Sequence, residues 1–224
     1  MKQATLAAAV AALPFLASPL PAPSADALHL RGARISFEYT ASSDQAALVV
    51  EAESETGLDR IEVRDPSGAA ILGLRGAGTG RGQGMYGFRV EAAEAPPSDL
   101  FDVYPEGLYR IRARTADGRL AVGTARLSHR LARAPVVLHP QSGQAGVPSS
   151  DLVLAWTLDP EAAEVRVNLE EGETDRMSVR LAGGTGSFRV PDGVLSPGRR
   201  CLLEVGVVGA DGNCTIVEVP FSTR

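Results

Sequence analysis

The segment PEGLYRIRARTADG, residues 105–118, shows the pattern that decides the fold. The apolar side chains of Tyr109, Ile111 and Ala113 alternate with arginines. A period of two residues is typical of a β-strand with one buried and one exposed face. Because the turn signal Ala116-Asp117-Gly118 follows at once, the segment predicts the first strand of a β-hairpin.

The same alternation recurs along the chain, in short runs divided by glycine and aspartate turn signals. No window of 12 or more residues has the apolar stripe of an amphipathic helix. Many short antiparallel strands are typical of β-sandwiches, so we expect an all-β fold of two tandem antiparallel β-sandwiches, immunoglobulin-like or fibronectin type III-like, after a signal peptide. The other alternating runs are residues 35–39, 61–63, 165–169 and 203–207.

The first 27 residues have the features of a secretory signal peptide. Lys2 provides the positive start, residues 4–16 are apolar and uncharged, and Ala25-Asp26-Ala27 matches a cleavage site. No later stretch is apolar enough to cross a membrane. We therefore expect a periplasmic or secreted protein without a transmembrane segment after signal cleavage.

A weak internal repeat divides the remaining chain. A second hairpin opens at Pro197-Gly198 and turns at Ala210-Asp211-Gly212, as the first turns at Ala116-Asp117-Gly118. Each hairpin closes a segment of about 100 residues, the usual size of a sandwich domain. We therefore expect two β-sandwich domains, residues 28–130 and 131–224, after the signal peptide of residues 1–27.

Residues 134–224 resemble a fibronectin type III module. The matching features are Ala134-Pro135, the run Leu152–Trp156 as strand B with its core tryptophan, Glu164–Val167 as strand C, and the terminal Phe221-Ser222-Thr223. The family's corner tyrosine is replaced by Cys201. The whole arrangement is similar to exported bacterial proteins with a fibronectin type III domain, which implies a fold and a compartment but no activity.

Composition excludes several classes of function. The net charge of −5 gives no general attraction to nucleic acid. Lys2 is the only lysine, so the mature chain has no phosphate-loop or Schiff-base lysine. No acid, base and nucleophile converge in the pattern. We expect no enzyme activity, no catalytic residues, no metal site and no cofactor.

The best candidate binding surface consists of Arg110, Arg112 and Arg114. A two-residue turn at Asp117-Gly118 would place them opposite the small Ala125, Gly123 and Ala121. Guanidinium groups over such a floor could grip carboxylates or phosphates in bidentate fashion. The alternative is a solvated outer face whose charge is balanced by Glu51, Glu53 and Glu62.

Three other features of the sequence are candidate sites. Pairing Leu203 with Phe221 would hold Cys201 and Cys214 roughly 30 Å apart, which excludes a disulfide between them. The acidic residues 170–175 could hold calcium, but their spacing does not match the helical calcium loop, and the favoured alternative is a solvated turn between strands. The aromatic residues of the loop 95–107 could stack on sugars or plug the core. The single tryptophan, Trp156, is expected in the core.

The sequence thus predicts an exported, non-enzymatic binding or structural module. Its partner would be an unknown protein or glycan of the cell envelope, and not nucleic acid. The alternative is an accessory carbohydrate-binding protein of a cell-envelope enzyme system.

Overall fold

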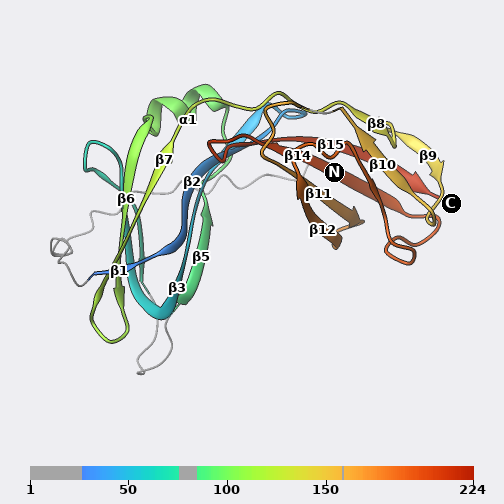
Figure 1. Cartoon of the computed structure of the whole chain (residues 1–224). Helices are drawn as coiled ribbons and strands as arrows, with labels where there is room; N and C mark the ends of the chain where they lie inside the picture. The colour runs from blue at the N-terminus through green and yellow to red at the C-terminus, as the bar shows by residue number, and fades with distance from the viewer. Residues whose placement is uncertain (1–26, 76–84, 158) are drawn as a thin grey trace, which may run out of the picture.

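The computed structural model describes residues 27–75, 85–157 and 159–224, and the predicted signal peptide lies almost entirely outside them. These residues form a mostly β structure with one short helix (Figure 1). Their strands make two sheets, one of 12 strands and one of three. No helix among the described residues has the length and apolar character needed to cross a bilayer.

The first lobe, residues 28–127, encloses one hydrophobic core. The strands of this lobe form two layers, and the longest strand, β3, takes part in both. Its first half pairs with β2 and β5, and its second half pairs with β4 and β6. Tyr109, Ile111 and Ala113 are fully buried in this core, as their alternation predicts. The elements are β1 (Leu28–His29), β2 (Arg31–Thr40), β3 (Gln45–Arg64), β4 (Ala70–Arg75), β5 (Met85–Glu91), α1 (Pro97–Val103), β6 (Gly107–Thr115) and β7 (Leu120–Leu127).

The second lobe, residues 137–224, has a core of its own. Trp156 lies in that core with 3% of its surface exposed, and its indole nitrogen donates a hydrogen bond to the Thr185 carbonyl oxygen at 2.8 Å. The prediction of a core tryptophan is confirmed. The elements are β8 (Val137–His139), β9 (Gln144–Val147), β10 (Val153–Trp156), β11 (Glu164–Glu171), β12 (Thr174–Ala182), β13 (Ser187–Arg189), β14 (Arg200–Val208) and β15 (Cys214–Thr223).

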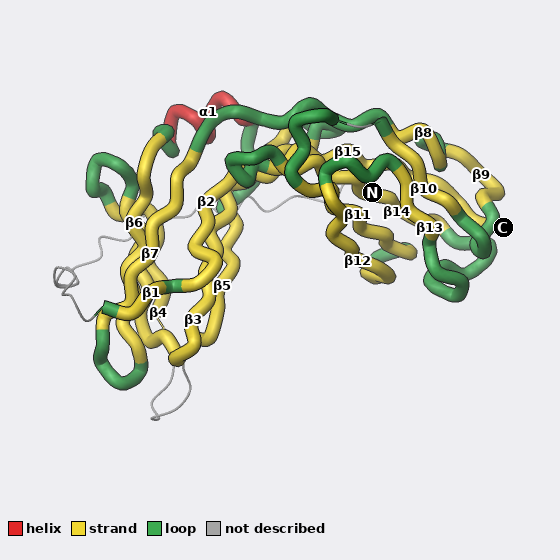
Figure 2. The backbone as a smooth tube through the Cα atoms, in the orientation of Figure 1, coloured by secondary structure: helices red, strands yellow, loops and turns green. Residues whose placement is uncertain are grey.

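The large sheet continues from one lobe into the other. The start of β15 pairs in parallel with the end of β2, from Cys214 opposite Glu38 to Ile216 opposite Thr40. Figures 1 and 2 show the two lobes as the arms of an arch, with β2 and β15 meeting near its top. The boundary between domains at residue 130 stays a prediction, since strand pairing crosses between the lobes.

The registers of both predicted hairpins are wrong. Arg110 pairs with Thr124 rather than Ala125, a shift of one residue. Leu203 pairs with Val219 rather than Phe221, a shift of two. Both hairpins turn through three residues, 116–118 and 210–212, whose last residue is a glycine with φ of about 90°. A three-residue loop with a left-handed glycine is a standard hairpin connection. The predicted loop of the first hairpin, Asp117-Gly118, is one residue too short, and the predicted pairing of the second centres its turn on Gly212, one residue too late.

The two cysteines remain far apart in the corrected register. Cys201 pairs with Phe221 and Cys214 with Val208, at opposite ends of one hairpin. Seven residues of strand separate them, roughly 23 Å at the usual rise, which is beyond the reach of a disulfide. Both are buried free thiols, and burial raises the pKa of Cys214 to about 12.

Candidate anion-binding surface

The three arginines of the candidate surface stand on the outer face of β6. Arg110 and Arg114 are exposed and Arg112 is half-buried. The predicted floor of small residues is wrong: Ala125, Gly123 and Ala121 pair with Tyr109, Ile111 and Ala113 and face the core. A one-residue shift of register moves every side chain to the opposite face of a sheet. The arginines instead stand beside Thr124, Val122 and Leu120 of β7.

Neighbouring strands add four more arginines to the same face. Arg60 and Arg64 of β3 pair with Arg114 and Arg110, Arg75 of β4 pairs with Arg60, and Arg126 of β7 pairs with Leu108, which shares the arginine side of β6. Directly paired residues point to the same side of a sheet. We call this set the arginine face; its members are Arg60, Arg64, Arg75, Arg110, Arg112, Arg114 and Arg126.

Few carboxylates balance this face. In β4, β6, β7 and the half of β3 from Leu58 to Arg64, the only acidic residues are Asp59 and Glu62. The expected balancing residues Glu51 and Glu53 belong to the first half of β3, where they pair with β2 and β5 in the other layer. A protein with a net charge of −5 therefore carries a concentrated positive surface.

Glu62 is held inside the arginine face. It is 7% exposed, and its carboxylate accepts a hydrogen bond from Arg64 Nε at 2.5 Å, with Arg60 at 3.7 Å. Arg64 also donates to the Gly68 carbonyl oxygen at 2.7 Å. The turn that presents Gly68 is fixed by Asp65, whose pKa is lowered chiefly by a hydrogen bond from Ser67. This part of the face is consequently preorganised.

Four members of the arginine face have no carboxylate within ion-pair distance among residues 27–75, 85–157 and 159–224: Arg75, Arg110, Arg114 and Arg126. The guanidinium of Arg114 reaches over the hairpin turn, 3.6 Å from the place a Cβ of Gly118 would occupy. These groups are available to an external anion.

Like charges placed directly opposite on neighbouring strands destabilise a sheet. The arginine face has three such pairs, Arg60 with Arg75, Arg60 with Arg114, and Arg64 with Arg110. An anion bound over them would relieve this repulsion, and guanidinium groups bind carboxylate, sulfate and phosphate through paired hydrogen bonds. The surface therefore offers the groups that binding of an external anion would need.

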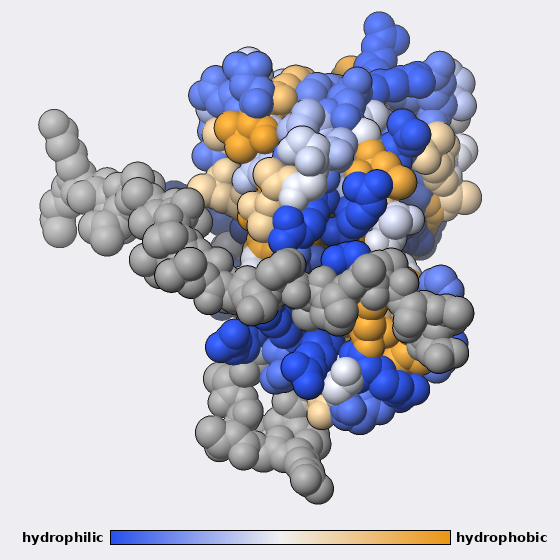
Figure 3. Space-filling view, turned by 90° about the vertical axis from the view of Figure 1, so that its left-hand side faces the viewer, coloured by the Kyte–Doolittle hydropathy of each residue, from blue (hydrophilic) through white to orange (hydrophobic). Residues whose placement is uncertain are grey.

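Figure 3 views the flank of the first lobe that carries β6 and β7. Hydrophilic residues dominate its lower part, around a smaller apolar area. Half-buried Leu120 and Val122 of β7 contribute apolar surface beside the arginines.

The groove between the two lobes provides a contrast. It is a cavity of about 210 Å³ whose lining includes Arg89, Arg166 and Glu38. Glu38 accepts hydrogen bonds from Arg89 at 2.7 Å and from Arg166 at 2.9 Å, and further carboxylates contact both arginines. The positive charges of Arg89 and Arg166 are thus neutralised within the protein, unlike those of the four unpaired members of the arginine face.

The other candidates are engaged in the fold. Glu171 of the acidic turn accepts a hydrogen bond from the Ser196 backbone at 2.7 Å. Across the described residues there is no group of three or more His, Cys, Asp or Glu side chains placed to hold a metal ion. In the loop 95–107, which forms α1, Phe101 packs against Phe37 and stacks on His129 at 4.2 Å. Phe101 therefore plugs the core, as one of the two predictions for this loop stated.

Sequence reasoning found three of the seven arginines. It missed Arg60, Arg64, Arg75 and Arg126, because only strand pairing brings β3, β4 and β7 beside β6. The alternation of Arg60, Glu62 and Arg64 with buried Ile61 and Val63 carries the same signal as β6 and could have found two of them.

No protein-family model matches the sequence, and no curated protein does. Among solved structures, the chain is similar to fibronectin(III)-like modules of CbhA from Clostridium thermocellum, with 14% identity, a TM-score of 0.35, and 87% of this chain and 93% of that chain covered. A two-domain fibronectin type III segment of chicken tenascin gives 12% identity, a TM-score of 0.33, and coverage of 87% and 99%. A tetra-tandem repeat from the extending region of a large adhesion protein gives 14%, 0.31, and 85% and 48%.

Proposed function

We propose that this protein is an exported, non-enzymatic binding module, of fibronectin type III-like architecture, that contacts an anionic partner of the cell envelope through its arginine face. Export rests on the signal features of residues 1–27. Binding rests on one observation: seven arginines share one face of a sheet whose strands carry only two carboxylates there, and four of those arginines have no carboxylate partner among the described residues.

The groups that catalysis would need are used elsewhere in the described structure, which supports a non-enzymatic role. Burial raises the pKa of the thiols of Cys201 and Cys214, so neither is a ready thiolate nucleophile. His129 lies between Phe101 and the carbonyl oxygen of Tyr104, 2.8 Å from its Nε2. A catalytic nucleophile needs a base within hydrogen-bond reach. Neither of these two contacts provides His129 with a nucleophile.

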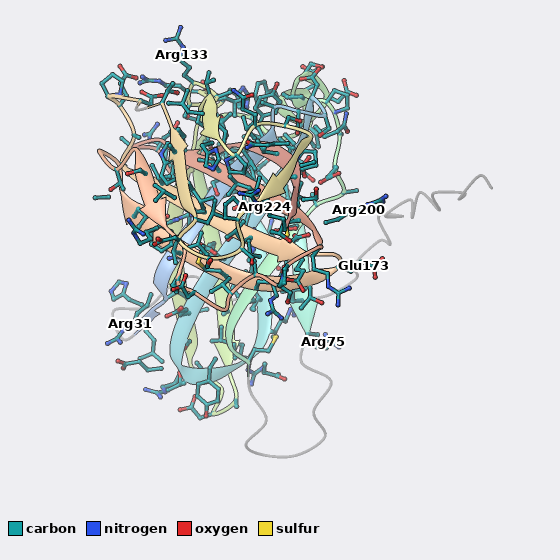
Figure 4. All side chains as sticks on the ribbon, turned by 90° about the vertical axis from the view of Figure 1, so that its right-hand side faces the viewer. Arg31, Arg75, Arg133, Glu173, Arg200 and Arg224 are labelled. Carbon is teal, nitrogen blue, oxygen red and sulfur yellow. The ribbon has the colours of Figure 1, made fainter. Side chains whose placement is uncertain are left out.

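Elution by salt from a dextran sulfate column tests the proposal. The double variant Arg110→Ser/Arg114→Ser removes two exposed arginines of the face. The matched control, Arg133→Ser/Arg200→Ser, removes two exposed arginines outside it; Figure 4 shows Arg133 and Arg200 well apart from Arg75. We expect the face variant to elute at clearly lower salt than both the wild type and the control, since the net charge changes equally. Equal elution of the two variants would refute the proposal.

A further inference from the structure

The arginine face is arranged as rows that run across the strands. Arg75, Arg60 and Arg114 are direct neighbours on β4, β3 and β6, and Arg64 and Arg110 form a second row on β3 and β6. Neighbouring strands lie about 4.8 Å apart, and alternate residues along β6 about 6.8 Å apart. The charges thus form a regular grid rather than a convergent cluster, which fits a ligand that repeats its charge along its length.

Glu62 shows which anion this grid already holds. Its carboxylate lies in the middle of the face, between Arg64 and Arg60, and pairs across the strands with Arg112. A carboxylate therefore fits between guanidinium groups at this spacing, with a charge-assisted hydrogen bond of 2.5 Å to Arg64. External carboxylates placed over the unpaired arginines would reproduce this contact.

The residues between the arginines narrow the class of polymer. The outward-facing paired positions are occupied by arginine, leucine, valine, threonine, glycine, alanine and Glu62, and none is aromatic. Binding of single-stranded nucleic acid relies on aromatic side chains on which bases stack. Neutral sugars likewise would find no aromatic ring to lie against. Recognition therefore has to come from charge and hydrogen bonding.

An extended peptide bound through its backbone does not fit over the middle of the rows. In one recurring mode, such a peptide adds a strand to an open sheet edge. The second half of β3 and β6 are each paired on both sides, whereas β4 pairs with β3 alone among the described strands. A polymer laid across β3 and β6 must therefore use its side groups and not its backbone.

From this grid we infer that the arginine face binds a linear polysaccharide of uronic acids, laid across β4, β3 and β6 along the row Arg75–Arg60–Arg114. The inference rests on the proposed function and deepens it by naming the chemical class of the ligand and its direction on the sheet. Each sugar presents its carboxylate at the edge of the ring. Arg75 and Arg114, at the two ends of the row, take carboxylates of the polymer, while Arg60 between them also contacts Glu62.

Calorimetric titration of the chain with polygalacturonate tests the inference. Fully methyl-esterified polygalacturonate is the matched ligand, because it keeps the sugar backbone and loses the charge. Dextran sulfate, polyglutamate and a single-stranded oligonucleotide of equal charge are the other probes. The row variant Arg75→Ser/Arg114→Ser is compared with Arg110→Ser/Arg126→Ser, which removes equal charge from the same face but leaves the row intact.

We expect polygalacturonate to bind tighter than the other probes, and esterification to abolish the binding. Losing two charge-assisted contacts should weaken affinity at least tenfold in the row variant, and less in the second variant. Circular dichroism melting verifies that both variants fold, and the single variants Arg75→Ser and Arg110→Ser replace any that does not.

Three results would overturn the inference. Tighter binding of polyglutamate, oligonucleotide or dextran sulfate would leave the proposed function standing and show that the ligand is not a polyuronate. Equal loss in the two double variants would refute the row and its direction. If no polyanion binds at physiological salt, the proposed function itself fails together with the inference.

Discussion

The hairpins β6–β7 and β14–β15 share the same turn geometry but differ in what their tips contact. Both turn through Ala-Asp-Gly in a three-residue loop, and the flanking residues Thr115 with Arg119, and Gly209 with Asn213, share a backbone hydrogen bond at 2.9 Å. The tip of the first hairpin lies at the surface, where the side chain of Arg119 donates to Asp117 at 2.8 Å. The tip of the second contacts the first lobe: Ala210 is exposed and Asp211 and Gly212 are half-buried, but the next residue, Asn213, is buried.

Asn213 accounts for that difference. It occupies the position of Arg119 and is 1% exposed. Its Oδ1 accepts a hydrogen bond from the Phe37 backbone at 2.8 Å, and its Nδ2 donates to the carbonyl oxygens of Ser128 at 2.9 Å and Arg130 at 2.7 Å. One turn geometry can thus make a free hairpin or a joint between lobes, depending on the residue that follows the glycine.

The hairpins also differ at their bases. Tyr109 of β6 is fully buried, and its hydroxyl donates to the Pro105 carbonyl oxygen at 2.9 Å. Cys201, near the start of β14, has only a contact of 4.0 Å from its sulfur to the Arg199 carbonyl oxygen. The base of the first hairpin is held by the tyrosine hydroxyl, and that of the second by Thr223, whose hydroxyl donates to the Ser196 carbonyl oxygen at 2.6 Å.

The largest expected effect comes from Trp156→Ala, which empties the core beneath the second hairpin. We expect a loss of about 3–5 kcal/mol in the free energy of unfolding, measured by urea denaturation followed by circular dichroism. The control Tyr86→Ala removes an aromatic side chain that is 63% exposed and should change little. A loss below about 1 kcal/mol for Trp156→Ala would contradict its place in the core.

The substitution Asn213→Ala tests the difference between the tips of the two hairpins. The change leaves the Phe37 amide and two carbonyl groups without their partner, so we expect a loss of about 2–3 kcal/mol. Arg119→Ala, at the same position of the first hairpin, should cost less than about 0.5 kcal/mol because its ion pair is exposed. Similar losses in calorimetric melting of the two variants would show that Asn213 is not a joint.

Tyr109→Phe removes the hydrogen bond at the base of the first hairpin and should cost about 1 kcal/mol at neutral pH. Burial, aided by the charge of Asp65, raises the pKa of Tyr109 to about 12 from 10.0. The folded state thus holds the phenol proton more tightly than the unfolded chain, and stability falls as pH rises from about 10 to about 12. Urea midpoints across this range should fall less steeply for Tyr109→Phe than for the wild type; parallel curves would contradict the assignment.

The smallest expected effect on stability comes from a change on the outer face of the β6–β7 hairpin. Arg114→Thr relieves the like-charge pairing of Arg114 with Arg60 and introduces a residue that favours strands. We expect unchanged or slightly raised stability, by up to about 0.5 kcal/mol, in chemical denaturation. A clear loss would mean that Arg114 supports the fold.

Much of the fold could be predicted from the sequence because each strand shows its own alternation. The burial of Tyr109, Ile111 and Ala113 and the positions of both turns are local properties of a few residues. The registers could not be fixed, because Ala-Asp-Gly fits hairpin loops that differ in length or in position by one residue. The loop of the first hairpin is one residue longer than predicted, and the turn of the second is centred on Asp211 rather than on Gly212. That difference of one residue moved Ala121, Gly123 and Ala125 from the arginine face to the core.

The candidate site was only partly predictable for a related reason. Arg110, Arg112 and Arg114 share a strand, so their common face follows from spacing. Arg75 and Arg126 join them only through pairings between segments distant in sequence. The role of Asn213 gave no signal, because a surface turn and a buried joint have the same residues up to Gly212.

The parallel pairing of β2 with β15 has a mechanical consequence. The end of β2 lies beside the start of β15, and the hydrogen bond from the Ala41 amide to the Ile216 carbonyl oxygen, 2.8 Å long, extends the contact. Tension on the chain before β2 and after β15 would draw these strands in opposite directions along their length. The bonds between them would then carry the load together, in shear, so a pulled molecule would resist parting at the very place where its two lobes meet.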